Sequence, residues 1–360
     1  MTFYWGLWIF FLLMSILLRE KFSNKNYSLL IVIIMILALI TGGREYVGAD
    51  WETYKIFYLT GIADDKSSGK TELLFQLLRD VSYYMGLSYG MFCCVVALLS
   101  LSILIKALKI FEIKNYYIGF LIYLSLFFCN YQFNIIRHGV LASFVLLGMA
   151  YLSKGDNRKA LISVIVGCGF HLTGLIFIPL LLIINKVFSR KWYLIVVALS
   201  FAFFIVDLSG RIMAAFPFLA LIDRVSGYVD TSQEETYKLS IGTIGFLVIT
   251  AYTILFRKND YDNNIGLRIT TNMVLVGFIV FCTLNAFSAI VQRLGNLFNL
   301  GVIIVIPYYW QATRKLTAKV LVRTLIITYL ALYYPKTWNV PNEKGEYSML
   351  PFKTDITNLF

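Results

Sequence analysis

An arginine followed by a histidine stands between two long apolar runs near the middle of the chain. The sequence YQFNIIRHG, residues 131–139, separates the apolar runs 116–129 and 140–152, so Arg137 and His138 lie at the edge of hydrocarbon. An arginine costs about 2.5–3.5 kcal/mol at the centre of a bilayer and less near its surface, so it is usually retained for a partner or a substrate. We therefore predict that Arg137 holds an anion. Interfacial anchoring of both side chains is the alternative.

Further arginines could share this anion. Arg293 has a similar setting, because the sequence SAIVQRLGNLFNL places it at the start of another apolar run. Free N–H groups and the helix dipole attract anions to helix N-termini, and the planar fork of arginine matches phosphate oxygens. Two or three converging arginines, with Arg44 or Arg224 among them, would form a clamp for a diphosphate. Interfacial anchoring is the simpler explanation for Arg224 taken alone.

The sequence GADWETY, residues 48–54, sets aromatic side chains close to a carboxylate. Tyr54 follows Asp50 by about one helical turn, and Trp51 is the residue after Asp50. Aromatic rings can stack on the apolar faces of sugars while carboxylates bind their hydroxyls. An aromatic belt at the membrane surface would have the same composition. Glu72 opens an amphipathic run, ELLFQLLRDVSYYMG, that we expect to form a helix lying on the bundle.

The composition is that of an integral membrane protein. Of the 360 residues, 59% are hydrophobic and 14% are charged, whereas about a quarter are charged in soluble domains. Several apolar runs reach the roughly 17–25 residues that cross a bilayer as a helix, so we expect an all-α polytopic fold. The net charge of +12 arises mostly from short loops beside these runs, where Lys and Arg set membrane orientation, so no nucleic-acid partner is expected. The five cysteines lie in apolar segments without metal-ligand spacing, and we expect no metal and no cofactor.

The positions of the basic residues predict the topology. Basic loops, which we assign to the cytoplasm, alternate with two loops of mixed sign, about residues 41–87 and 207–238, which we assign to the outer face together with both termini. This pattern gives about ten full transmembrane helices in a single membrane domain, residues 1–334, followed by an external tail, residues 335–360. The ionisable residues singled out all map to the outer face on this topology: Arg44, Asp50, Arg137, His171, Arg224 and Arg293.

The apolar segment 160–184 contradicts this alternation if it is one span, because basic residues flank both of its ends. A re-entrant or split hairpin, broken at GCGFHLTG, residues 167–174, removes the conflict. Non-helical backbone at membrane depth is tolerated only where it is buried in protein or lines a polar cavity. His171 would then lie near Arg137. A simple crossing with a buried histidine is the alternative.

Five short motifs, in this order, resemble the EpsG family of Wzy-like polysaccharide polymerases: TGGREYVGADWETY, TELLF, NYQFNIIRHGVLASFVLLGMAYL, FHLTGLIFIPLLL and a lone QR before an apolar run. The resemblance covers residues 40–310. The arginine after the QF element of that family corresponds to Arg137, and the His-x-Ser/Thr of its later hairpin corresponds to His171-Leu172-Thr173. The resemblance to this family implies a fold similar to that of the lipid-donor (GT-C-like) glycosyltransferases.

The resemblance also implies a metal-independent glycosyltransferase of the bacterial inner membrane. Such an enzyme joins polyprenyl-diphosphate-linked oligosaccharides on the external, periplasmic side, as in O-antigen, capsule or exopolysaccharide assembly. The growing glycan leaves its carrier and is transferred to a hydroxyl of the incoming unit. The partners implied are the lipid-linked donor and acceptor and the lipid bilayer, and a chain-length regulator protein is a further partner that the family allows.

Roles for individual residues follow from this chemistry. The leaving diphosphate would be bound and stabilised by arginines, and a general base would take the proton of the acceptor hydroxyl. The residues assigned are Arg137, Arg293, Arg224 and Arg44 for the diphosphate, His171 or Asp50 for the base, and Trp51, Tyr54, Gln132 and Glu72 for the sugars. The alternative functions are a flippase or transporter of lipid-linked oligosaccharides, and an O-antigen ligase or acyltransferase with His171 as base.

Overall fold

The structure is a computed structural model that describes residues 1–18, 24–61, 72–215, 241–312, 315–339 and 348–359. Every element of these residues is a helix, which confirms the predicted all-α class. Within these residues, five helical segments are long and apolar enough to cross a membrane: Tyr89–Ile110, Ile136–Ser153, Ile265–Thr283, Val291–Ala312 and Leu316–Trp338. Three shorter apolar helices are Thr2–Leu17, Ser28–Gly42 and Gly242–Phe256. The chain is thus built as a membrane protein, and the count of about ten spans stays a prediction.

The chain divides into two compact units. The first unit comprises Met1–Leu181 and Ile306–Phe360, and the second comprises Leu182–Val305. Each unit is described by itself.

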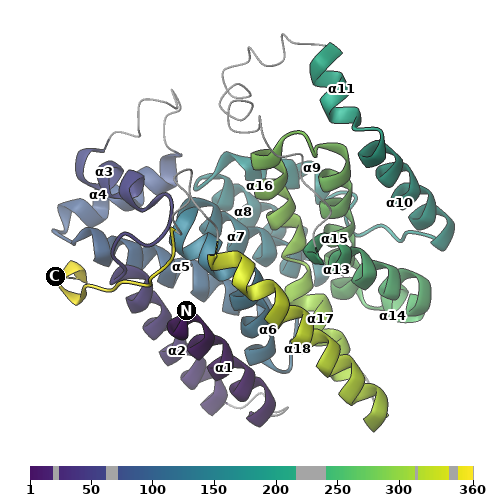
Figure 1. Cartoon of the computed structure of the whole chain (residues 1–360), viewed down its shortest axis with the longest axis horizontal. Helices are drawn as coiled ribbons and strands as arrows, with labels where there is room; N and C mark the ends of the chain where they lie inside the picture. The colour runs from purple at the N-terminus through teal and green to yellow at the C-terminus, as the bar shows by residue number, and fades with distance from the viewer. Residues whose placement is uncertain (19–23, 62–71, 216–240, 313–314, 340–347, 360) are drawn as a thin grey trace. The chain divides into compact units, whose positions relative to one another are not determined.

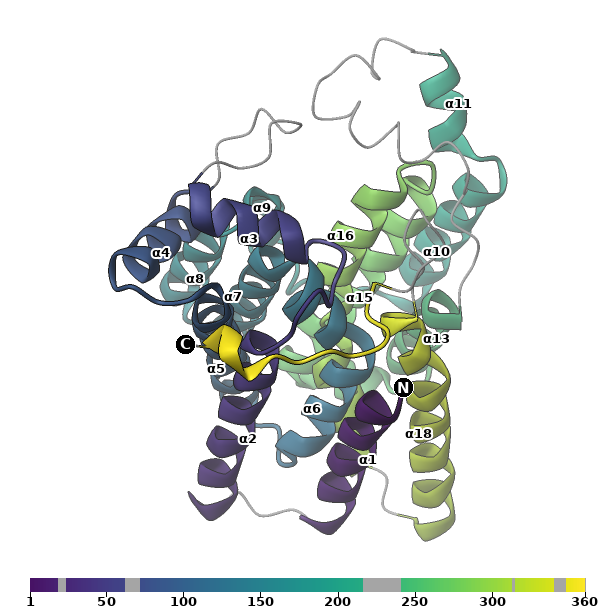
Figure 2. The same cartoon turned by 60° about the vertical axis from the view of Figure 1, so that its left-hand side comes forward.

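A stack of helices forms the centre of the first unit (Figures 1 and 2). α7 (Ile136–Ser153) packs against α5 (Tyr89–Ile110) on one side and α8 (Asn157–Cys168) on the other, and α2 (Asn24–Gly42) packs against α5. The hydroxyl of Ser100 on α5 lies 3.2 Å from the carbonyl oxygen of Gly139 and 3.1 Å from the hydroxyl of Ser143, both on α7. Small residues and hydroxyl pairs of this kind hold apolar helices together where lipid gives no hydrophobic drive.

The predicted span 116–129 is an α-helix that widens into a π-helix. α6 (Tyr116–Tyr123) packs against α1 (Thr2–Leu17) and continues as η1 (Leu124–Asn134), which packs against α18 (Leu316–Trp338). η1 ends at Asn134, and after Ile135 the next helix, α7, begins at Ile136. π-helical turns are rare and occur frequently at functional sites. Arg137 and His138 therefore lie in the first turn of a long helix, directly after an unusual helical segment.

Two short helices follow α2. α3 (Trp51–Thr60) and α4 (Leu73–Tyr84) form in the loop that was assigned to the outer face, and α4 is the helix expected from the amphipathic run. Its buried residues are Phe75, Arg79 and Ser82, which share one helical face. Phe75 joins residues of α3, α5 and α7 in one buried apolar cluster, so α4 is fixed to the helix stack.

The apolar segment 160–184 is broken at the predicted place. α8 ends at Cys168, and a short 3₁₀ helix, η2 (Leu172–Ile176), follows and leads into α9 (Phe177–Leu180). Gly167, Gly169 and Gly174 lie within the predicted break. The chain therefore does not cross here as one helix, and the membrane side of the break stays a prediction.

The C-terminal segment pairs with the loop after α2. The N–H of Glu45 donates to the carbonyl of Lys353, and the N–H of Asp355 donates to the carbonyl of Gly43. The segment ends in η5 (Ile356–Leu359). α18 runs through residue 335 to Trp338, and the expected external placement of residues 335–360 stays a prediction.

α15 (Ile265–Thr283) is the central helix of the second unit. It packs against α10 (Arg190–Ile205), α13 (Ile241–Ala251), α14 (Lys258–Asn263) and α16 (Ser288–Asn299). The remaining elements are α11 (Leu208–Ala215), the π-helix η4 (Tyr252–Phe256) and α17 (Val302–Ala312), which extends past the end of the unit.

A close backbone contact at Gly48, in the first unit, can be tested by substitution. Gly48 has a φ of 108°, and a Cβ there would lie 2.2 Å from the carbonyl oxygen of Phe133. Gly86 also has a positive φ, 70°, but nothing lies within 4 Å of its Cβ position. We expect Gly86→Ala to cost about 1–2 kcal/mol, as is usual for a left-handed residue, and Gly48→Ala to cost more because backbone must move. Thermal unfolding of both variants in detergent measures this, and equal midpoints would contradict the close contact.

Candidate active site

Glu72 connects two segments that lie far from it in sequence. Its Oε2 lies 2.8 Å from Nη1 of Arg137 in an ion pair, and its Oε1 accepts a hydrogen bond of 3.2 Å from the N–H of Leu172. The Glu72 side chain is 11% exposed and that of Arg137 is 30% exposed. A charge-assisted hydrogen bond in so protected a place is stronger than one at an open surface. The start of α4 is thereby fixed to the start of α7 and to the broken segment.

Backbone groups make the same connection. The first N–H groups of a helix have no partner within it, and those of Leu74 and Phe75 donate to the carbonyl of Gly169, at 2.9 and 3.4 Å. A Cβ on Gly169 would lie 2.5 Å from Cγ of Leu74, so only glycine allows this approach. The motifs TELLF and FHLTG therefore meet in space, which explains why both can belong to one site.

His171 is held by the turn that follows it. Its Nδ1 lies 2.9 Å from Oγ1 of Thr173 and accepts a 3.3 Å hydrogen bond from the N–H of Thr173. A backbone N–H can only donate, so this bond requires a lone pair on Nδ1, and the neutral ring carries its proton on Nε2. In this arrangement His171 presents a hydrogen-bond donor at Nε2.

His138 packs against His171. The two ring centroids are 4.9 Å apart and the rings are perpendicular, while the ring centroid of Tyr131 lies 5.8 Å from that of His138. His138 is 1% exposed, whereas His171 is half-buried. The sequence left His138 without a role. The structure makes it the inner neighbour of His171.

Arg137 lies against aromatic rings and keeps donors for a ligand. Its Cζ is 5.9 Å from the ring centroid of Tyr54 and 5.8 Å from that of Phe75. Its Nε is buried, and no described residue accepts a hydrogen bond from it. Buried polar groups usually have a partner, so an orphaned donor requires an explanation such as an absent ligand. An anion that reached Arg137 would find a preformed, partly desolvated cation.

Three predicted ligands have structural contacts in the first unit. Arg44 is 1% exposed, donates to the carbonyls of Thr41 and Val47 and lies over the Phe133 ring. Trp51 is buried and donates from Nε1 to the Arg44 carbonyl. Gln132 is buried too, and it donates to Tyr123 Oη and Ser100 Oγ. These contacts stabilise the fold, and the expected roles in diphosphate and sugar binding stay predictions.

Asp50 is the half-exposed residue that precedes α3. The N–H of its neighbour Ala49 donates to Oδ1 of Asn134, at 2.7 Å, and Asn134 is the last residue of η1. Asn134 lies three residues before Arg137. The loop that carries Asp50 is thus fixed beside the start of α7, where Arg137 lies.

The structure does not test whether the other two predicted arginines belong to this site. Arg293 belongs to the second unit, where it is the sixth residue of α16 and thus lies beyond the first turn that was expected to hold it. Arg224 lies outside the described residues. The convergence of Arg137 with either of them stays a prediction.

Long apolar helices, with a cation and a histidine pair held at helix starts, define a helical membrane protein with a polar site. The chain belongs to the EpsG family, whose model matches residues 27–354. This confirms the resemblance and extends it at both ends. Comparisons with curated proteins and with solved structures find no match. The family supports a role of the polysaccharide-polymerase type, which is a glycosyltransferase activity in general.

We expect Glu72→Ala to loosen the broken segment, because it removes the acceptor of the Leu172 N–H. Amide hydrogen exchange at Leu172 should rise by about tenfold or more, which corresponds to one lost hydrogen bond to a charged group. Glu52→Ala, at an exposed glutamate in the first turn of α3, is the matched control. Unchanged exchange at Leu172 in Glu72→Ala would show that Glu72 does not hold the segment.

Proposed function

We propose that this protein polymerises polyprenyl-diphosphate-linked oligosaccharide repeat units on the external face of the bacterial inner membrane. The observation that supports it most is the joining of Arg137, Glu72 and His171 in one site of an EpsG-family chain. The proposed side follows from the alternation of basic and mixed loops. The substrates are the lipid-linked donor and acceptor, and a chain-length regulator is a further proposed partner.

The proposed reaction is a glycosyl transfer. The acceptor hydroxyl oxygen forms a bond to the anomeric carbon of the growing glycan, and the bond from that carbon to the diphosphate oxygen breaks. The proton of the hydroxyl goes to a general base, and polyprenyl diphosphate leaves with the bonding electrons. Arg137 stabilises the negative charge that develops on the diphosphate, with Arg293 as the second proposed cation. Preorganised charge of this kind is usually the largest catalytic contribution, so we propose that no metal ion is required.

Asp50 is the base that we now favour over His171. A base needs a free lone pair directed at the substrate, and Nδ1 of His171 already accepts from Thr173, so Nε2 carries the proton. His171 would instead donate from Nε2 to the diphosphate or to a sugar oxygen. Asp50 is half-exposed beside the start of α7. Tyr54 and Glu72, which both contact Arg137, are the proposed sugar contacts that lie nearest to it.

Purified protein with a lipid-diphosphate oligosaccharide should produce a ladder of longer glycans, also in the presence of EDTA. Arg137→Ala and Arg293→Ala should each lower the rate by about 100-fold or more, as is typical when a group that stabilises the transition state is removed. Arg158→Ala is the control, because this exposed arginine lies in the first turn of α8, among the basic residues assigned to the cytoplasm. Full activity of both site variants would contradict the clamp.

The same assay separates the alternative functions. A flippase would move the lipid-linked unit across a vesicle membrane without lengthening it. A ligase or acyltransferase would transfer one group and stop. Only repeated addition, with polyprenyl diphosphate released at each step, supports polymerisation.

Cysteine labelling tests the side of the site. The native cysteines Cys93, Cys94, Cys129, Cys168 and Cys282 are all buried, so they give a low background. In cells with a permeabilised outer barrier, a membrane-impermeant thiol reagent should label His171→Cys from the external side. Lys159→Cys lies at the start of α8, among the basic residues assigned to the cytoplasm. It should react only after the inner membrane is opened. The reverse pattern would overturn the hairpin.

A further inference from the structure

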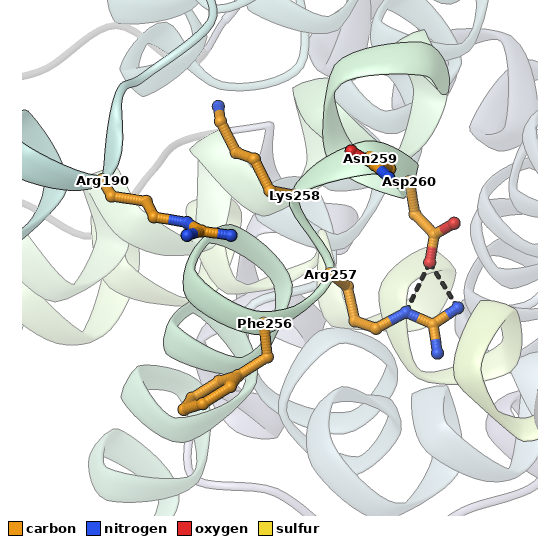
Figure 3. Close-up of a pocket in the computed structure, with 6 residues that line it drawn as sticks. All are labelled: Arg190, Phe256, Arg257, Lys258, Asn259 and Asp260. Carbon is orange, nitrogen blue, oxygen red and sulfur yellow. Dashed lines mark hydrogen bonds and ion pairs between the residues drawn. The ribbon is translucent and has the colours of Figure 1, made fainter.

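A basic cavity lies in the second unit. Its volume is about 270 Å³, and it is lined by Arg190, Phe256, Arg257, Lys258, Asn259 and Asp260 (Figure 3). Arg190 is the first residue of α10, Phe256 ends η4, and Lys258 begins α14. The cavity thus forms where one helix starts and another ends.

The cavity carries a surplus of positive charge. Arg190, Arg257 and Lys258 are cations, and Asp260 is the one carboxylate of the lining. Arg257 pairs with Asp260 through Nε and Nη2, and Lys258 pairs with Asp262 and donates to the carbonyl of Phe188. Counting Asp262, three cations face two carboxylates, so one positive charge remains. No described residue forms an ion pair with Arg190, and it provides this charge.

The side chains of the cavity leave the positive charge of Arg190 accessible to a ligand. In Figure 3 Arg190 extends from the start of α10 toward the backbone of residues 256–258, while Arg257 turns away to Asp260. The fork of Arg190 and the side-chain amide of Asn259 are donors that suit phosphate oxygens. Asp260 and Phe188 hold the two neighbouring cations in place, so the cavity is formed before a ligand arrives.

Large apolar side chains at this cavity and on α10 are exposed on the surface of the protein. Phe256 is 75% exposed and Trp192, in the first turn of α10, is 61% exposed. Leu194 and Ile195 continue the exposed apolar surface along α10. Aromatic residues next to cations, at the end of an apolar helix surface, are typical of the boundary between hydrocarbon and water. The loops before α10 and after η4 are those assigned to the cytoplasm, where the leaflet is rich in anionic lipid.

We propose that this cavity binds the phosphate headgroup of an anionic phospholipid, whose acyl chains lie along α10. A volume slightly below the 300–1,000 Å³ range that is about typical for whole small-molecule ligands suits a headgroup with its chains outside. The surplus charge selects an anionic headgroup over a zwitterionic one. The exposed apolar side chains select a lipid over a soluble phosphate.

Native mass spectrometry of the full-length protein, with equal amounts of phosphatidylglycerol and phosphatidylcholine, tests this. The wild-type protein should retain phosphatidylglycerol preferentially. Arg190→Gln should lower that retention by about tenfold or more, which corresponds to one charge-assisted hydrogen bond. Lys191→Gln, the next residue of α10 and absent from the lining, is the matched control.

A variant with the opposite effect completes the test. Asp260→Asn removes the carboxylate that holds Arg257, so retention of phosphatidylglycerol should rise. The proposal is wrong if Arg190→Gln and Lys191→Gln retain the lipid equally while both elute as folded protein. Displacement of the lipid by millimolar glycerol 1-phosphate would show that the site takes a soluble phosphate, and would also overturn it.

Discussion

The contact on which the site depends is the carboxylate of Glu72 between the guanidinium of Arg137 and the N–H of Leu172. It joins the start of α4, the start of α7 and the broken segment after α8. It also sets the electrostatics of the site, because an arginine this protected from water needs a counter-charge. A diphosphate carries more negative charge than one carboxylate. It can therefore compete with Glu72 for Arg137. The ion pair of Glu72 with Arg137 would then keep the site preformed until the substrate binds.

Irregular backbone surrounds this contact. The π-helix η1 ends three residues before Arg137, and the break after α8 places His171 directly before η2. Both irregular segments are supported by regular helices, since α18 packs on η1 and the start of α4 binds the carbonyl of Gly169. Such backbone is tolerated at membrane depth only where protein or a polar cavity satisfies it. The fold thus keeps its irregular backbone where chemistry is proposed.

The sequence allowed the helices and the break to be predicted, because apolar length and glycine placement act locally. The bounds of α7 lie within four residues of the apolar run 140–152, and the break falls at Gly167–Gly174. The side-chain roles could not be predicted in the same way. Arg44 donates from Nε and Nη1 to carbonyls three residues away on each side, and Glu72 finds its partner 65 residues later. Such pairings depend on tertiary packing, which the periodicity and charge pattern of the sequence do not predict.

The most direct test of this account is the affinity of a short-chain prenyl diphosphate for purified variants. Competition between Glu72 and the diphosphate predicts that Glu72→Gln, which keeps an acceptor for Leu172 but loses the charge, binds more tightly than wild type. Arg137→Ala should bind at least about tenfold more weakly, because a charge-assisted contact is lost. Equal affinities of wild type, Glu72→Gln and Arg137→Ala would contradict the claim that the diphosphate is held at Arg137.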